Sequence, residues 1–250
     1  MIKDDKKCVD VIMPNYNKAK YLDASIKSII NQTYKSWKLY IIDDCSNDNS
    51  IDLLKKYKNN KKIKIIFLKK NKGPSYCRNI GLKLSQSKII CFLDSDDCWR
   101  KLKIEKQLSF LKKYNYDFVY SDYYFKIDNI KRKTNIVKSF IFQQFIFNSA
   151  INTSTIMIKK RLLKKIKFRN SFLEDYIFKC EILKKGIRAY KNNYISAYYN
   201  QSENSRSQNK LQNLVNLFKV NKKYLKLNFF INIKSILLIS INYFKKYRIF

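Results

Sequence analysis

Short apolar runs alternate with helix-like stretches over the first hundred residues. Four runs rich in β-branched residues predict strands, and they span residues 8–13, 38–43, 63–68 and 88–93. Between the first two runs, Leu22, Ile26, Ile29 and Ile30 recur at helical spacing, which predicts a helix with one apolar face. This alternation predicts an α/β fold, in which a mostly parallel central sheet carries helices on both faces.

After Trp99 the pattern becomes less regular. It predicts a helix over about 101–114, a tyrosine-rich strand over 117–127 and a basic connection around 131–133. Further helix-like runs follow Ser171 and Ser207, the second leading into an apolar, lysine-flanked end. We therefore expect the second half to be mixed rather than parallel.

Polar residues collect where the first, second and fourth predicted strands end, at 15–17, 43–46 and 94–97. In open α/β sheets, ligands bind outside the carboxyl ends of the strands, so these clusters should share one site. Asp94 and Asp96 are one residue apart, and carboxylates are what Mg²⁺ or Mn²⁺ prefers. Taken alone, the triplet is better explained as a turn in which Asp96 or Asp97 caps the helix expected near residue 101.

A second acidic pair, Asp43 and Asp44, follows an equally apolar strand and opens into a polar loop. Asp44 is suited to accept hydrogen bonds from a nucleotide. Ser46 or Asp48 can cap the next helix, and we assign that role to Asp48.

The charge of the chain is extreme: Lys+Arg 53 against Asp+Glu 19, no histidine, and a formal net charge of +34. Such a field attracts anions, including nucleic acid, anionic lipid and phosphorylated substrates. Part of the excess reflects a composition typical of an AT-rich genome, because Gly is 3 and Pro 2.

Six scattered cysteines form no CxxC pair, and no histidine is available to join them. We therefore expect no structural zinc site, and we expect the protein to lie in a reducing compartment. The first seven residues lack the apolar core of a signal peptide, and residues 229–244 are interrupted by Asn232, Lys234 and Asn242. We expect a cytoplasmic protein, either soluble or peripherally bound to the inner face of the cytoplasmic membrane.

Several motifs resemble, in order and spacing, those of the family 2 glycosyltransferases. They are VIMPNYN at 11–17, YL at 21–22, SI at 25–26, QTY at 32–34, Trp37, DDCSND at 43–48, RNIG at 78–81 and FLDSDD at 92–97. The resemblance covers nearly the whole chain and is strongest over residues 9–100. It implies a GT-A fold, a nucleotide-diphospho-sugar donor (a UDP-sugar is expected), a divalent cation, and transfer with inversion at the anomeric carbon.

By motif match, three residues should contact the nucleotide base. Pro14 and Tyr16 would lie against it and Asp44 would hydrogen-bond it. The ring of Tyr16 is equally suited to brace the first loop by packing.

The same match assigns the rest of the donor site. Arg78 would lie near the phosphates, Asp94 and Ser95 near the ribose or sugar, and Asp96 on the metal ion, Mg²⁺ or Mn²⁺. Many family members carry a histidine after the last core strand. Here a polar stretch at 198–207 stands instead and is expected to close over the donor, with Arg206 or a lysine contacting phosphate. The third metal ligand stays unassigned.

Inversion by direct displacement needs a base on the acceptor side. Glu174 and Asp175 resemble the family's acidic acceptor-side motif, so both are candidates for the base, although adjacent residues on a helix do not face the same way. Ser171 and Glu174 have the spacing of a capping box, which would give Glu174 a structural role and leave Asp175 as the base.

The resemblance also divides the chain. We expect a catalytic domain over 1–207, with a nucleotide-sugar-binding half at 1–100 and an acceptor-side half at 101–207, followed by a helical extension at 208–250. The extension is basic and aromatic, so it can lie in a membrane interface, or equally pack on the core. The motifs are most similar to those of the teichuronic-acid and O-antigen type transferases, which implies a saccharide or polyprenyl-linked acceptor in bacterial surface polysaccharide synthesis.

Two other functions compete with glycosyl transfer. A basic nucleic-acid-binding protein would explain the charge, but no nucleic-acid-binding motif is found and the acidic residues gather where a phosphate backbone would be repelled, so no nucleic acid is expected as a partner. A metal-dependent nucleotidyltransferase would also use carboxylates at strand ends. It should carry a glycine-rich phosphate loop, which three glycines do not provide.

Overall fold

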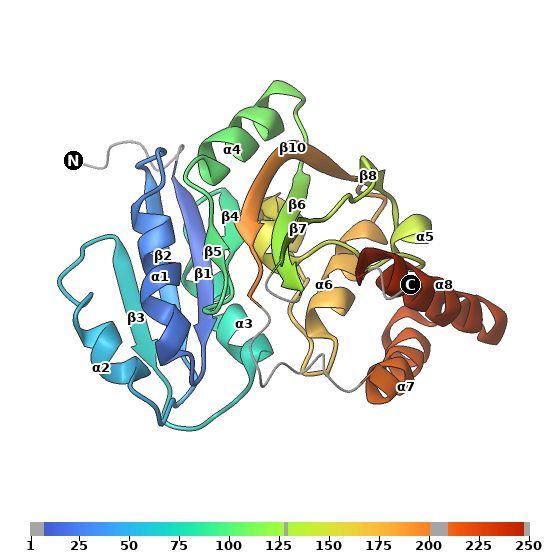
Figure 1. The fold of residues 1–250 in the computed structure, drawn as a ribbon, viewed down its shortest axis with the longest axis horizontal. Helices are drawn as coiled ribbons and strands as arrows, with labels where there is room; N and C mark the ends of the chain where they lie inside the picture. The colour runs from blue at the N-terminus through green and yellow to red at the C-terminus, as the bar shows by residue number, and fades with distance from the viewer. Residues whose placement is uncertain (1–7, 128–129, 201–209, 248–250) are drawn as a thin grey trace.

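A computed structural model describes residues 8–127, 130–200 and 210–247 (Figure 1). Within these ranges ten strands form one sheet, whose main path runs β3-β2-β1-β4-β9-β6-β10-β5. Two short strands lie off this path: β7 pairs with β6 and β8 pairs with β10.

The first half of the sheet is parallel, as the apolar runs predict. It comprises β1 (Val9–Asn15), β2 (Trp37–Asp43), β3 (Ile63–Phe67) and β4 (Ile89–Phe92). Val9 is in register with Trp37 on one side and with Ile89 on the other. Every residue of β1 is buried, so this strand lies at the centre of the core.

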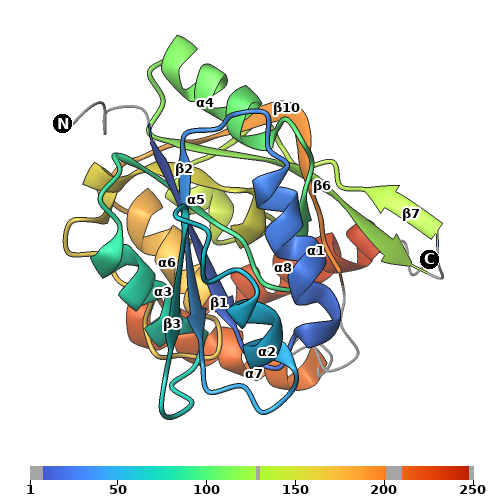
Figure 2. The same cartoon turned by 90° about the vertical axis from the view of Figure 1, so that its left-hand side faces the viewer.

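Helices cover both faces of these strands. They are α1 (Ala19–Ile30), α2 (Ser50–Lys55), α3 (Pro74–Leu84) and α4 (Lys103–Lys113). Figure 2 shows α1 and α2 on one side of β1 to β3 and α3 on the other. The predicted apolar face of α1 is confirmed, because Leu22, Ile26 and Ile29 are buried. A Cβ at Gly81 would collide with the side chain of Ile12, so glycine lets α3 pack closely on β1.

The second half of the sheet is mixed, also as expected. It comprises β5 (Cys98–Trp99), β6 (Phe118–Ile127), β7 (Ile130–Lys133), β8 (Ser139–Phe140), β9 (Met157–Lys159) and β10 (Ala189–Tyr198). β10 runs parallel to β6, whereas β9 is antiparallel to both β4 and β6. The stretch expected as a basic connection at 131–133 is instead part of β7, which pairs with β6 as an antiparallel hairpin.

Helical segments complete this half and the C-terminal end. They are α5 (Phe142–Phe145), the 3₁₀ turns η2 (Thr153–Thr155) and η3 (Lys160–Leu163), α6 (Glu174–Leu183), α7 (Lys210–Val220), the π-helical turn η4 (Asn221–Leu225) and α8 (Phe229–Tyr247). In Figure 1, α7 and α8 lie together beyond α5 and α6, at the side of the molecule away from β3. No helix in the described ranges is long and apolar enough to cross a membrane.

Candidate active site

The polar ends of β1 and β2 meet at one edge of the sheet, as the strand-end clusters predict. Asn15 donates a 2.7 Å hydrogen bond from Nδ2 to Oδ2 of Asp43, and the amide of Asp44 donates to the carbonyl of Asn15. Asp43 also accepts from the amide and the hydroxyl of Ser46. The two loops are therefore tied together by a buried carboxylate.

Pro14 and Tyr16 lie beside this junction. Pro14 is buried within β1, and Tyr16 follows the strand with its side chain exposed. An exposed ring is available for stacking, and the base contact of both residues stays a prediction.

Asp44, the residue assigned to the nucleotide base, holds the loop that leads into α3. Its two carboxylate oxygens accept hydrogen bonds of 2.7 Å each from the amides of Lys72 and Gly73. Gly73 adopts a φ of 84°, which a glycine reaches without strain. Asp44 is buried and is also hydrogen-bonded by the side chain of Cys77, and its contact with the base stays a prediction.

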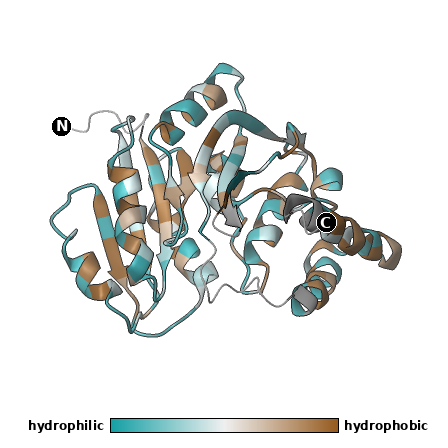
Figure 3. Ribbon diagram, in the orientation of Figure 1, coloured by the Kyte–Doolittle hydropathy of each residue, from teal (hydrophilic) through white to brown (hydrophobic). Residues whose placement is uncertain are grey.

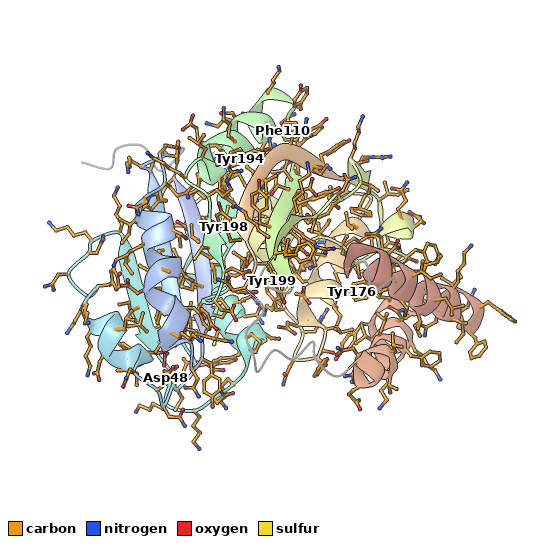
Figure 4. The ribbon with its side chains drawn as sticks, in the orientation of Figure 1. Asp48, Phe110, Tyr176, Tyr194, Tyr198 and Tyr199 are labelled. Atoms are coloured by element: carbon orange, nitrogen blue, oxygen red, sulfur yellow. The ribbon has the colours of Figure 1, made fainter. Side chains whose placement is uncertain are left out.

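Asp48 connects the first residues of two helices. Its carboxylate accepts from the amide of Ala19 at 2.9 Å and from that of Ser50 at 2.9 Å. Burial acts to raise the pKa of Asp48, but the hydrogen bonds from Ser50 and Ala19 outweigh it and lower the pKa below its usual value. Figure 4 shows Asp48 at the edge of the sheet where β1 to β3 end. The residue that precedes α2 is Asn49, whose side chain makes no cap, so Asp48 provides the predicted capping carboxylate from one position earlier.

The triplet Asp94–Asp96 lies at the same edge, after β4. The side chain of Asp94 is 34% exposed, and that of Asp96 is 19% exposed and pairs with Nζ of Lys18 at 2.9 Å. Ser95 is buried, and its carbonyl accepts a hydrogen bond from Ser25. Two carboxylates of the triplet thus remain open to a ligand.

The helix-cap explanation of the triplet is wrong. α4 is preceded by Leu102 and has no side-chain cap. Asp97 is buried and accepts from Oγ of Ser154 at 2.5 Å and from the amide of Asn200 at 3.1 Å. Burial, followed by the charges of Asp94 and Asp96, raises the pKa of Asp97 well above its usual value.

Arg78 lies buried between two carboxylates. Nη2 donates to Asp94 at 2.7 Å and Nη1 to Glu174 at 3.0 Å, while the guanidinium lies 5.2 Å from the ring centre of Phe168. Burial opposes the charge of Arg78, yet Asp94 and Glu174 outweigh burial and raise its pKa. Arg78 therefore positions Asp94, and its contact with the phosphates stays a prediction.

The capping box proposed for Ser171 and Glu174 is wrong. α6 begins at Glu174 itself, after Leu173, and the Glu174 carboxylate turns to Arg78. The buried guanidinium needs a counter-charge, and this requirement outweighs the capping spacing. Glu174 still has a structural role, different from the expected one.

Asp175 follows in the first turn of α6 with its side chain 39% exposed. Nζ of Lys179, one turn later, donates to its Oδ2 at 2.8 Å, and Thr153 donates at 3.3 Å. Burial would raise the pKa of Asp175, but the ammonium of Lys179 and then the charge of Arg78 outweigh it and lower the pKa. Asp175 is therefore held ionised and accessible, as the predicted base must be.

Two residues that the sequence pattern does not single out join these parts. Ser154 donates to Asp97 and accepts from the amide of Asp94 at 3.2 Å, while its neighbour Thr153 bonds Asp175. The η2 turn thus connects the triplet to the predicted base. The sequence signal for this turn is weak, because it consists only of a short polar stretch. In the structure, Asn152 accepts a hydrogen bond from the amide of Ser154 at 2.7 Å.

The stretch expected to close over the donor is described only up to Asn200. This residue donates from Nδ2 to the carbonyl of Asp96 at 2.7 Å, so the chain leaves β10 directly beside the triplet. Residues 201–209, with Arg206, lie outside the described part.

An aromatic surface lies around β10 and the residues that lead into α4. Tyr194 and Tyr198 line a hollow of about 600 Å³ together with Trp99 and Arg100. Tyr198 also stacks on Tyr124 with ring centres 5.5 Å apart. Figure 4 shows Tyr194 and Tyr198 on β10 and Tyr199 just beyond the end of the strand.

The residues present suit a divalent cation bound together with phosphates. No group of three His, Cys, Asp or Glu side chains that could hold a metal ion occurs in the described ranges. Mg²⁺ and Mn²⁺ sites in phosphate-binding enzymes commonly use only one or two carboxylates, with phosphate oxygens completing the set. Asp96, with Asp94 beside it, provides that number, and Asp96 as metal ligand stays a prediction.

Comparison with known proteins decides the family. The model of glycosyl transferase family 2 matches residues 10–173, well over half of the chain. The chain belongs to glycosyl transferase family 2. This membership favours glycosyl transfer over the nucleic-acid-binding and nucleotidyltransferase alternatives.

Two curated relatives cover most of this glycosyltransferase. The putative teichuronic acid biosynthesis glycosyltransferase TuaG of Bacillus subtilis is 32% identical over 210 residues, covering 82% of this chain and 83% of TuaG. The UDP-Glc:alpha-D-GlcNAc-diphosphoundecaprenol beta-1,3-glucosyltransferase WfgD of Escherichia coli is 33% identical over 217 residues, covering 84% and 83%.

Solved structures of glycosyltransferases have the same fold. S. aureus TarS (residues 1–349, in complex with UDP-GlcNAc) aligns with a TM-score of 0.74 at 20% identity, over 95% of this chain and 72% of that chain. The mannosyltransferase PcManGT from Pyrobaculum calidifontis, in complex with GDP-Man and Mn²⁺, aligns with a TM-score of 0.70 at 15% identity, over 92% and 69%. The predicted GT-A fold is confirmed, and with it an enzyme class that uses nucleotide-sugar donors.

Proposed function

We propose that this glycosyltransferase moves a sugar, with inversion, from a UDP-sugar to a lipid-linked saccharide in the synthesis of a bacterial surface polysaccharide. The names of TuaG and WfgD support this assignment, because teichuronic acid, UDP-glucose and a diphosphoundecaprenol acceptor appear in them. Both relatives cover more than four fifths of the chain.

The observation that carries the proposal is the pattern of exposed and buried carboxylates. Asp94, Asp96 and Asp175 stay partly exposed, whereas Asp43, Asp44 and Asp97 are buried behind them. Arg78 connects Asp94 with Glu174, the residue before Asp175. The η2 turn contacts both Asp94 and Asp175, so the donor-side and acceptor-side carboxylates are held relative to each other.

In the proposed reaction, Asp175 takes the proton from the acceptor hydroxyl as its oxygen attacks the anomeric carbon. The bond from that carbon to the diphosphate oxygen breaks, and the nucleoside diphosphate leaves with the bonding electrons. Attack from the side opposite the leaving group inverts the anomeric centre. Lys18 and Arg78 place positive charge beside the carboxylates on the donor side.

A divalent cation on Asp96 would neutralise charge on the departing diphosphate, and Asp94 would contact the ribose or the sugar of the donor. Asp44, Pro14 and Tyr16 would hold the base. Ser95 is buried, so we propose that it acts through its place in the triplet backbone.

A lipid-linked acceptor places the reaction at a membrane surface. We accordingly propose that the enzyme works peripherally on the inner face of the cytoplasmic membrane, where nucleotide sugars are available. The catalytic domain would span residues 1–207, and residues 208–250 would form the extension that brings it to the membrane.

Donor binding tests the proposal directly. Titrating a panel of UDP-, GDP- and dTDP-sugars by calorimetry, with Mg²⁺, Mn²⁺ or EDTA, should give the tightest binding for a UDP-sugar with metal. Asp96→Ala should lose the metal-dependent part of that affinity, by about tenfold or more. Asp52→Ala, an exposed carboxylate on α2, is the matched control and should bind like the wild type. A chain that binds no nucleotide sugar under any of these conditions would exclude the proposed activity.

A further inference from the structure

The C-terminal helix α8 turns polar side chains toward the protein. Asn232 and Ser235 are buried, and Nδ2 of Asn221 donates to Oδ1 of Asn232 at 2.9 Å and to Oγ of Ser235 at 3.2 Å. Ser235 in turn donates to the carbonyl of Ile146 at 2.5 Å. Among the side chains of α8 that the structure describes, Ile236 and Ile239 add apolar contact with the core on this side.

Large apolar side chains occupy the opposite side of the same helix. We name them the outer stripe: Phe229 (64% exposed), Phe230 (81%), Ile233 (38%), Leu237 (58%) and Ile241 (46%). Successive members recur at helical spacing, so they form one continuous surface along α8. Figure 3 shows α8 strongly hydrophobic at the outer side of the molecule. Contiguous apolar surface of this kind marks an interaction site.

The charge around the outer stripe is of one sign. Residues 204–250 contain ten lysines and arginines and no aspartate or glutamate. Lys222, Lys223, Lys226 and Lys234 are exposed in or beside the helix. A second copy docked on the stripe would bring like charges together, whereas an anionic lipid surface complements both the charge and the apolar side chains.

We propose that the outer stripe docks the enzyme on a bilayer of anionic lipid, with α8 lying in the plane of the interface. The apolar side chains enter the boundary between head groups and acyl chains, and the flanking lysines contact the phosphates. This rests on the peripheral placement in the proposed function and names the surface responsible. The buried asparagines and Ser235, with Ile236 and Ile239, hold α8 on the core and leave the outer stripe for lipid.

Vesicle co-sedimentation of the full chain tests this docking. Wild type should sediment with vesicles of phosphatidylcholine and phosphatidylglycerol, only weakly with phosphatidylcholine alone, and less as salt rises. The triple substitution Phe230→Gln, Ile233→Gln and Leu237→Gln should lower the partition onto anionic vesicles by about tenfold or more. Phe67→Gln with Ile130→Gln is the matched control, since both residues are exposed and lie outside the extension; this control should sediment like the wild type.

Donor binding separates this proposal from the proposed function. The stripe variant should keep the wild-type affinity for nucleotide sugar in solution, because no substituted residue lies at the sheet edge. Docking is overturned if wild type does not sediment, if the stripe variant sediments equally well, or if light scattering shows a wild-type dimer that the stripe substitutions dissolve. If the wild type binds no nucleotide sugar, the proposed activity is excluded, but the vesicle result still decides whether the outer stripe binds lipid.

Discussion

Two loop carboxylates of the donor-side half and the predicted base of the acceptor-side half are held in different ways. In the donor-side half, Asp44 and Asp48 accept hydrogen bonds from backbone amides of neighbouring loops and helices. In the acceptor-side half, Asp175 is held mainly by side chains, the ammonium of Lys179 and the hydroxyl of Thr153, with a smaller contribution from the backbone of Tyr176. A backbone amide is kept in every substitution except one to proline, whereas the side chains that hold Asp175 can be replaced. Substitutions of these two loop carboxylates should therefore affect stability, whereas substitutions at and beside Asp175 should affect the rate.

The largest effect is expected from Asp175→Asn. Removing the base should lower kcat about 10²- to 10⁴-fold, because proton removal from the acceptor hydroxyl is lost. Donor affinity, measured by calorimetry, should stay within about twofold of wild type, since Asp175 touches only acceptor-side residues. Glu181→Gln, on the same helix but paired with Arg169, is the control and should transfer normally. Normal turnover by Asp175→Asn would show that another group acts as the base.

A smaller effect, about tenfold in kcat, is expected from Lys179→Met, which keeps the volume but removes the charge. Lys179 is buried and also donates to the carbonyl of Ile151, so its ammonium is fixed in place. Without it, burial should dominate and raise the pKa of Asp175, leaving Arg78 as the nearby cation.

The sign of the pH effect follows from the ionised state of the base. In the wild type the lowered pKa keeps Asp175 ionised down to below its usual titration range, so kcat should hold through mildly acidic pH. In Lys179→Met the acid limb of the rate profile should move to higher pH. Lys184→Met, near the end of α6, serves as control. A simple loss of rate with an unchanged pH profile would limit Lys179 to a structural role.

The donor-side half was largely predictable from the sequence. Its strands are short apolar runs, and they pair in parallel. Their polar carboxyl ends must therefore lie at one edge of the sheet. The cluster at 43–48 therefore indicated both a ligand site and a cap. What the pattern could not show was that both oxygens of Asp44 accept from the loop at Lys72 and Gly73, because that contact joins positions 28 and 29 residues apart.

The acceptor-side half and the extension were less predictable, because distant contacts decide them. The capping-box spacing at Glu174 was overruled by Arg78, which lies 96 residues away in the chain. Thr153 and Ser154 carry no local sign that they connect the triplet to Asp175. For the extension, the sequence left membrane contact and packing on the core equally open, and the hydrogen bonds of Asn221 show which side of α8 is turned to the protein.

The smallest effect concerns the donor-side half and should leave catalysis intact. Asp48→Ala removes the acceptor for the first amides of α1 and α2 and should lower the free energy of unfolding by about 1–2 kcal/mol, measured by urea denaturation. Because its folded-state pKa is lowered, the Asp48 contribution should be fully present above the unfolded-state pKa of about 3.9 and be lost as pH falls through the folded-state value. Asp48→Asn keeps one acceptor oxygen and should lose less, with no such pH dependence. If Asp48→Ala reduced transfer as strongly as Asp175→Asn while unfolding at the wild-type urea concentration, the donor-side carboxylates could not be regarded as the rigid part of the site.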